Sequence, residues 1–281
     1  MIPSEFDYTV PATLEEAVRA LSEGGEDAKL MAGGHSLLPL MKLRLAAPTL
    51  LVDLRQVPGL RGVQRENGAV RIGAMTPHAE LEDTKELGLI SEAAGLIADR
   101  QVRHRGTVGG SLAHGDQASD LPAVMLATEA TVTAQGAGGQ REIPVSELFQ
   151  DYLTTSLAHD EVLTEIRVPA LEGYSYGYEK FTRRAEDWAM VGVAALVSVR
   201  DGVCQDVRVG LTHMASTALR ASAVEDALRG QPLDGERIAR AAELAAEGTD
   251  PPGDLNASAD YKRHLARVLT RRALQKAAGL S

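Results

Sequence analysis

Two short stretches carry most of the information in this chain: Ala32-Gly33-Gly34-His35-Ser36 and Thr107-Val108-Gly109-Gly110-Ser111. The first follows the apolar Leu30-Met31, and each precedes a segment able to begin a short helix. Paired glycines lack β-carbons, so a bulky anion can approach the backbone closely. Glycines also adopt φ angles that other residues avoid. Two such loops that meet in space would hold the two phosphates of a dinucleotide through backbone N–H groups. Either pair alone is weak evidence, because Gly-Gly is common in ordinary tight turns.

The composition is that of an ordinary globular protein. The 281 residues are enough for two domains or three small ones, and 44% are hydrophobic and 24% charged. The net charge of −10 argues against a nucleic-acid-binding surface, which requires clustered lysine and arginine. We therefore expect no nucleic-acid partner.

A single cysteine, Cys204, excludes a disulfide within the chain and an iron–sulfur cluster held by four of its own thiolates. No histidine has the spacing of a metal ligand relative to carboxylates or cysteine, so no metal site is predicted. No catalytic dyad or triad is apparent either.

The first seven residues lack the basic and apolar regions of a secretory signal. The longest apolar run, residues 188–199, is too short to cross a bilayer as a helix. These features predict a cytoplasmic protein that does not insert into a membrane.

The first 130 residues predict alternating strands and helices. Thr13 and Glu16 form a capping box that opens a helix ending at Gly24-Gly25. Ser36 is expected to cap a short helix between strands at 29–31 and 50–52, which predicts a small parallel unit. A further strand is expected at 70–72. Helices are expected to start at Thr76-Pro77, to cover residues 91–98, and to run from an Asp120 N-cap through Ala127.

Strands are also expected at 131–133 and 162–168. The sequence pattern changes near residues 169–174, where we place a domain boundary. Alternating tyrosines at 174, 176 and 178 predict a strand, followed by strands at 189–199 and 207–211. Three helices are expected near 218–228, 236–247 and 261–276.

Three ordered blocks give the chain a family resemblance. They are LMAGGHSLLP (30–39) with LVDL (51–54), IADRQVR (97–103) running into GTVGG (106–110), and YEKF (178–181) with RAEDWA (184–189). With these blocks the chain resembles, over nearly its whole length, the FAD-binding medium subunit of molybdenum hydroxylases such as carbon monoxide dehydrogenase and xanthine dehydrogenase.

The resemblance implies an α+β (mixed α/β) fold in three parts. Residues 1–55 and 56–172 would form two subdomains that clamp FAD. Residues 173–281 would form a C-terminal α+β domain with an antiparallel sheet and helices.

The resemblance also implies the binding residues. One side of the pyrophosphate would be held by the first stretch and its flanks: Ala32, Gly33, Gly34, His35, Ser36 and Leu37. The other side would be held by Thr107, Gly109 and Gly110. Many relatives carry asparagine where this chain has Ser111, whose shorter side chain puts direct contact in doubt.

Three further positions match the family. Asp120 would contact the ribityl or phosphate region, Lys180 would lie near the flavin ring, and Trp188 would pack against it. Each has a plainer alternative: Asp120 as an N-cap, Lys180 as a solvated side chain, Trp188 as core packing. His35 in the first stretch could likewise serve only the loop backbone.

The implied function is electron transfer. FAD on this chain would collect electrons from [2Fe–2S] clusters on a small partner, which receives them from a molybdenum cofactor on a large partner, and pass them to NAD, a quinone or O₂. The single cysteine agrees with this division, because this chain cannot supply the clusters. Two alternatives stay open: a self-contained FAD-dependent oxidoreductase, and a non-catalytic nucleotide-binding scaffold. The substrate is not readable from this chain.

Overall fold

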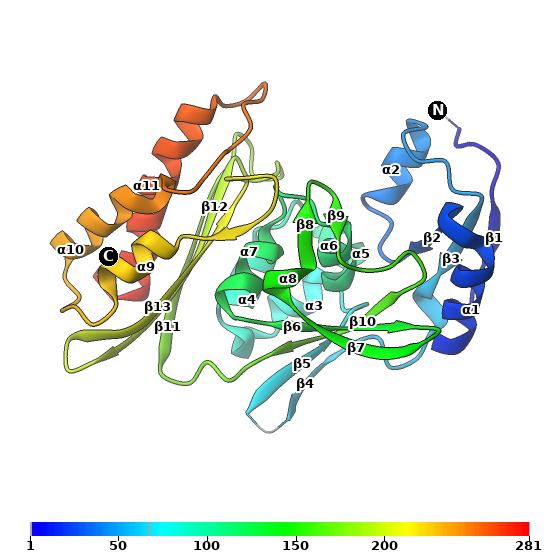
Figure 1. Ribbon diagram of the computed structural model, residues 1–281, viewed down its shortest axis with the longest axis horizontal. Coiled ribbons are helices and arrows are strands. Elements are labelled where there is room, and N and C mark those ends of the chain that lie inside the picture. The colour runs from blue at the N-terminus through cyan, green and yellow to red at the C-terminus, as the bar shows by residue number, and fades with distance from the viewer. Residues whose placement is uncertain (1, 67, 281) are drawn as a thin grey trace.

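Three main β-sheets follow one another along the chain, with helices between and outside them (Figure 1). The computed structural model describes residues 2–66 and 68–280. The mixed α+β class expected from the sequence is confirmed. In the described part of the chain, no helix is both long and apolar enough to cross a bilayer.

The N-terminal sheet is small and parallel. Its order is β1-β3-β2, with β1 at Asp7–Thr9, β2 at Ala28–Met31 and β3 at Leu50–Asp53. Helix α1 (Leu14–Gly24) covers one face, because its apolar residues pack on β3. The Thr13 cap is confirmed, because Thr13 Oγ1 accepts the Glu16 amide at 3.2 Å; Glu16 reaches back as expected but accepts the Ala12 amide, at 2.8 Å, instead of the Thr13 amide. The remaining elements are η1 (Gly25–Asp27), α2 (Leu37–Lys42) and η2 (Leu54–Gln56).

The second sheet is antiparallel, in the order β4-β5-β10-β6-β7. Its strands are β4 (Val63–Glu66), β5 (Ala69–Gly73), β6 (Thr131–Gly136), β7 (Gly139–Pro144) and β10 (Val162–Val168). Around it lie α3 (His78–Asp83), η3 (Lys85–Leu87), α4 (Leu89–Gly95), α5 (Arg100–Arg105), α6 (Val108–His114), α7 (Asp120–Ala127) and α8 (Val145–Leu148). A short hairpin of β8 (Phe149–Asp151) and β9 (Thr154–Thr155) follows α8.

The third sheet is antiparallel and carries helices on its outer face (Figure 1). Its strands are β11 (Tyr174–Phe181), β12 (Val191–Arg200), β13 (Val203–Thr212) and β14 (Leu219–Arg220). The helices are α9 (Ser222–Leu228), α10 (Gly235–Ala242), η4 (Glu243–Ala246) and α11 (Ala259–Ala277). Residues 191–197 of β12 are all buried, because α11 covers one face of the sheet and α7 the other. This explains the continuous apolar run there.

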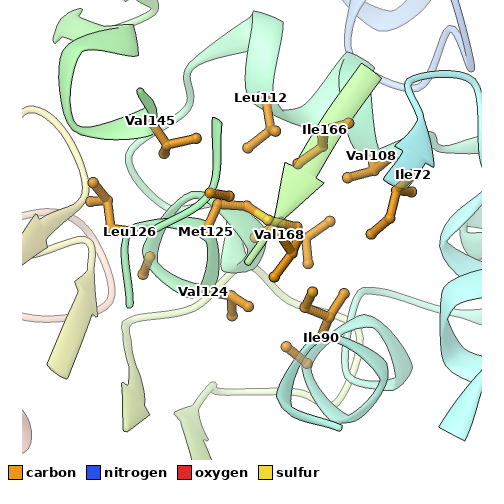
Figure 2. Close-up of a cluster of buried hydrophobic side chains, with 14 of the residues drawn as sticks. Ile72, Ile90, Val108, Leu112, Val124, Met125, Leu126, Val145, Ile166 and Val168 are labelled. Atoms are coloured by element: carbon orange, nitrogen blue, oxygen red, sulfur yellow. The ribbon is translucent and has the colours of Figure 1, made fainter. Parts of the chain in front are cut away.

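Helix α7 joins the second and third sheets. All eight of its residues are buried, and its apolar side chains share one core with β5, β6 and β10 (Figure 2). That core continues into the third sheet through Tyr178 and Leu196. The three sheets fall within residues 1–55, 56–172 and 173–281, but packing is continuous across residue 172, so the domain boundaries stay a prediction.

Several local expectations were wrong. Helix α3 begins at His78, because Thr76 is buried and its hydroxyl bonds to Gly62 instead of capping a helix. The helix expected at 91–98 runs from Leu89 to Gly95. Ser36 precedes α2 without a side-chain capping bond. Ser119 occupies the N-cap position of α7, and Asp120 is its first helical residue.

Candidate functional site

One cavity of about 650 Å³ collects the residues predicted from the sequence. A volume of this size is typical of a small-molecule site. Its wall includes all thirteen predicted residues: Ala32, Gly33, Gly34, His35, Ser36, Leu37, Thr107, Gly109, Gly110, Ser111, Asp120, Lys180 and Trp188. They come from the β2–α2 connection, the start of α6, the start of α7, β11 and the segment between β11 and β12.

The first stretch connects β2 to α2 and leaves donors unused. Gly34 has a φ of +77°, a left-handed conformation that glycine adopts without strain. No backbone carbonyl among residues 2–66 and 68–280 accepts the amide hydrogens of residues 33–36. Consecutive unpaired amides on a cavity wall suit an anion.

The second stretch is the start of helix α6 and not a loop. Thr107 is the N-cap, and its hydroxyl accepts the Gly110 amide at 3.2 Å. The Gly109 amide donates to the Ala74 carbonyl at 2.8 Å, and the Ser111 amide donates to the Thr107 carbonyl at 3.0 Å. The second stretch therefore offers a wall without β-carbons, and its amides already have acceptors.

The two stretches meet, as the sequence predicted. A β-carbon built on Gly33 would lie 2.2 Å from the Arg105 carbonyl oxygen. One built on Gly110 would lie 2.8 Å from Thr107 Oγ1 and 3.6 Å from the Ala32 β-carbon. Glycine is required for this approach at position 33, whereas a β-carbon at position 110 would meet Ala32 at an ordinary van der Waals distance.

A buried ion pair stands on the wall beside α7. Lys180 Nζ lies 2.9 Å from Asp120 Oδ2, and it also donates to the Leu96 carbonyl at 2.9 Å. The Tyr178 hydroxyl donates to the other carboxylate oxygen at 2.5 Å. The side chains of Lys180 and Asp120 are 5% and 4% exposed, so the solvated-lysine alternative is wrong.

Electrostatics at this pair follow from burial. Burial raises the pKa of Asp120 above its ordinary value, while the Lys180 ammonium and the Tyr178 hydroxyl act in the opposite direction. Burial and the neighbouring Asp120 carboxylate raise the pKa of Tyr178 well above its ordinary value. Tyr178 therefore remains a hydrogen-bond donor.

Trp188 belongs to the segment between β11 and β12 and is 58% exposed, so the core-packing alternative is wrong. The next residue, Ala189, is buried, and its carbonyl accepts a hydrogen bond from His213 Nδ1 at 2.8 Å. Trp188 thus projects an indole beside an anchored backbone.

The sequence reasoning missed several wall residues. His78 is buried, and its Nδ1 has no hydrogen-bond partner in the described part of the chain. Burial lowers its pKa to about 4, with His35 and Arg103 acting in the same direction. Ser119 also lies on the wall, where its hydroxyl is 2.6 Å from that of Ser111. No spacing signal marked either residue, because each reaches the cavity through tertiary contacts.

These features fit a dinucleotide. Unpaired amides suit phosphate oxygens, glycine surfaces admit a bulky group, and Lys180 places an ammonium group, paired with Asp120, on the wall. Among residues 2–66 and 68–280, no group of three or more His, Cys, Asp or Glu is placed to hold a metal ion.

Two family models together match most of the chain. Residues 4–171 match the FAD binding domain in molybdopterin dehydrogenase, and residues 176–277 match the CO dehydrogenase flavoprotein C-terminal domain.

Relatives and solved structures match this chain over nearly its full length. The carbon monoxide dehydrogenase medium chain of Hydrogenophaga pseudoflava is 43% identical, covering 99% of this chain and 98% of its own length. The 6-hydroxypseudooxynicotine dehydrogenase complex subunit alpha of Paenarthrobacter nicotinovorans is 41% identical, with 99% of this chain and 96% of its own length covered.

A chain of the Hydrogenophaga pseudoflava carbon monoxide dehydrogenase structure superposes with a TM-score of 0.97 at 44% identity, covering 100% of this chain and 99% of that chain. A chain of quinoline 2-oxidoreductase from Pseudomonas putida 86 superposes with a TM-score of 0.95 at 34% identity, covering 100% and 99%. The chain therefore belongs to the family of FAD-binding medium subunits of molybdenum hydroxylases.

Proposed function

We propose that this chain is the FAD-carrying electron-transfer subunit of a molybdenum hydroxylase complex. The observation that carries the proposal is the convergence of all thirteen predicted residues on one cavity. When bound there, FAD supplies a two-electron acceptor that releases electrons singly or in pairs. The comparisons give no support to the self-contained oxidoreductase or to the scaffold.

The chain's own residues have distinct tasks in this proposal. The unpaired amides of residues 33–36 bind the pyrophosphate and replace its hydration, which a buried anion otherwise loses at great cost. The glycines of both stretches admit the phosphates to the backbone. Trp188 covers the aromatic ring system and limits access to it.

Lys180 acts through its fixed charge. Because Asp120 and the Leu96 carbonyl hold its ammonium group, the positive charge stays at one point on the wall. A positive charge beside an electron acceptor favours the reduced form of that acceptor. Because the Asp120 carboxylate balances this charge, the pair acts as a fixed dipole that tunes the reduction potential of the site.

The partners proposed are a large subunit with a molybdenum cofactor and a small subunit with [2Fe–2S] clusters. The word "medium" in the names of relatives supports three subunits of different size. The one cysteine, Cys204, is buried, and burial raises its pKa to about 11, so it offers no thiolate to a cluster. We propose a cytoplasmic location, with NAD, a quinone or O₂ as the terminal acceptor.

Anaerobic reduction of the FAD-loaded single chain tests the proposal. Dithionite should bleach the flavin, whereas carbon monoxide, purines, aldehydes and N-heterocycles should leave it oxidised until both partner subunits are added. Bleaching by one of these substrates without partners would establish a self-contained oxidoreductase instead. A chain that takes up no FAD would favour the scaffold.

A further inference from the structure

A partly buried hydrogen-bond chain links the outer helix α11 to Ala189, the residue that follows Trp188. His213 follows β13, and its backbone has a φ of +63°. Its ring contacts two different parts of the molecule: Nδ1 is 2.8 Å from the Ala189 carbonyl oxygen, and Nε2 is 3.0 Å from Lys262 Nζ. The sequence reasoning gave His213 no role.

Lys262 determines which atom donates in each hydrogen bond of this series. Its side chain, on α11, is fully buried, and Nζ donates to the Pro252 carbonyl at 2.8 Å and to Asp254 Oδ2 at 2.7 Å. An ammonium group has three hydrogens and no acceptor, so the third contact makes His213 Nε2 the acceptor. The ring proton then lies on Nδ1 and is donated to the Ala189 carbonyl.

The Ala189 carbonyl accepts this hydrogen bond one residue after Trp188, which lines the cavity. Ala189 follows Trp188 directly. The other backbone hydrogen bonds of residues 182–190 join residues close together in sequence, such as the Asp187 amide to the Arg184 carbonyl at 3.1 Å. Met190 anchors the end of this segment by packing in the C-terminal core, and the bond from His213 adds a polar tie next to Trp188.

His213 also holds a second part of the wall. Its backbone amide donates to the Gln117 carbonyl at 2.8 Å, and the neighbouring Asp116 lines the cavity. One residue outside the cavity wall thus connects two wall segments that lie far apart in sequence.

We propose that His213, oriented by Lys262 and Asp254, is a positioning residue that holds Trp188 at the cavity wall. The effect on FAD rests on the proposed function above, but the placement of Trp188 does not. His213 does not line the cavity, so it acts through the backbone of Ala189.

Trp188 is the only tryptophan, so its fluorescence reports this segment directly. The main variant is His213→Gly, because glycine keeps the positive φ and removes the ring. The matched variant is His213→Asn, because asparagine tolerates this φ and its amide nitrogen can replace the Nδ1 donor. A third variant, Lys262→Met, removes the ammonium group that orients the ring without touching Ala189.

In the FAD-free full-length chain, His213→Gly should lower the anisotropy of Trp188, because an untethered loop moves on the nanosecond timescale. It should also increase acrylamide quenching, by less than about twofold because the indole is already 58% exposed. His213→Asn should restore most of both signals, and Lys262→Met should resemble His213→Gly. Far-UV circular dichroism should stay unchanged in all three. Unchanged Trp188 signals in His213→Gly, or equal changes in the asparagine and glycine variants, would overturn the positioning role.

FAD retention separates this inference from the proposed function. If the wild-type chain binds no FAD while His213→Gly still loosens Trp188, the proposed function fails and the positioning role stands. If the wild-type chain binds FAD and His213→Gly leaves Trp188 unchanged, the positioning role fails alone.

Discussion

Gly33 packs directly against the backbone of Arg105. A β-carbon at Gly33 would lie 2.2 Å from the Arg105 carbonyl oxygen and 2.8 Å from the Gly106 α-carbon. These are backbone atoms, so no side-chain rotation can make room. The contact joins the β2–α2 connection to the residues that lead into α6, and it sets the separation of the two glycine stretches.

Gly33→Ala should therefore open this contact. The added methyl group has to displace one of two backbone segments, at a cost of about 1–3 kcal/mol in the free energy of unfolding. FAD affinity should fall at least about tenfold, which corresponds to about 1.4 kcal/mol of lost binding. Urea unfolding and ultrafiltration with FAD measure the two effects. Gly138→Ala is the matched control, because a β-carbon at Gly138 meets nothing within 4 Å; equal FAD affinity in both variants would contradict the assignment.

Gly110→Val should abolish FAD retention while the chain stays folded. The valine methyl groups would extend from a β-carbon position only 2.8 Å from Thr107 Oγ1 toward Ala32, and so fill the gap between the two stretches. The purified variant should be colourless, with the circular dichroism of the wild type. Wild-type FAD affinity in this variant would refute the role of the second stretch.

Where contacts are local or motifs mark them, the sequence placed the elements correctly, and the predicted site residues line one cavity, while their contact with FAD stays a prediction. The parallel N-terminal unit and the strands at 131–133 and 162–168 are present, and the two glycine stretches meet. Prediction from the sequence failed where residues distant in sequence determine the role of a side chain. Asp120 looked like an N-cap, but it is the first helical residue of α7, and its carboxylate is bound by Lys180, sixty residues away. His78 and His213 carry no spacing signal, because burial and tertiary partners give them their roles.

The Asp120–Lys180 pair should show strong coupling. Lys180→Met leaves a buried carboxylate without its cation and should cost about 3–5 kcal/mol. The double variant with Asp120→Asn should be more stable than the sum of the single changes predicts, by about 1–3 kcal/mol, because no lone charge remains. Urea unfolding of the four chains gives this coupling. The exposed pair Arg240–Glu236 serves as the control and should show little coupling; additive effects at Lys180 and Asp120 would contradict the inference.

Trp188→Ala should separate binding from stability. Because the indole is 58% exposed, its removal should change the free energy of unfolding by less than about 0.5 kcal/mol. Loss of aromatic stacking should weaken FAD binding by about 0.5–1.5 kcal/mol. Flavin fluorescence titration measures the binding, and Trp188→Tyr should retain most of it. A large loss of stability with unchanged FAD affinity would give Trp188 a structural role only.

His78 should make the FAD-free chain less stable in acid. Burial lowers the pKa of His78 to about 4 in the folded chain, from an ordinary value of 6.5. Between these values the unfolded state binds a proton that the folded state does not, so the stability contributed by neutral His78 is fully present above pH 6.5. It is lost as the pH falls toward 4, and the whole change amounts to about 3 kcal/mol.

His78→Gln cannot titrate, so the difference in unfolding free energy between wild type and variant should shrink by that amount, or change sign, from pH 7 to pH 4. Urea unfolding at half-unit pH steps measures it. Other titrating groups contribute equally to both chains, and parallel pH profiles would show that His78 is protonated inside the fold at no cost.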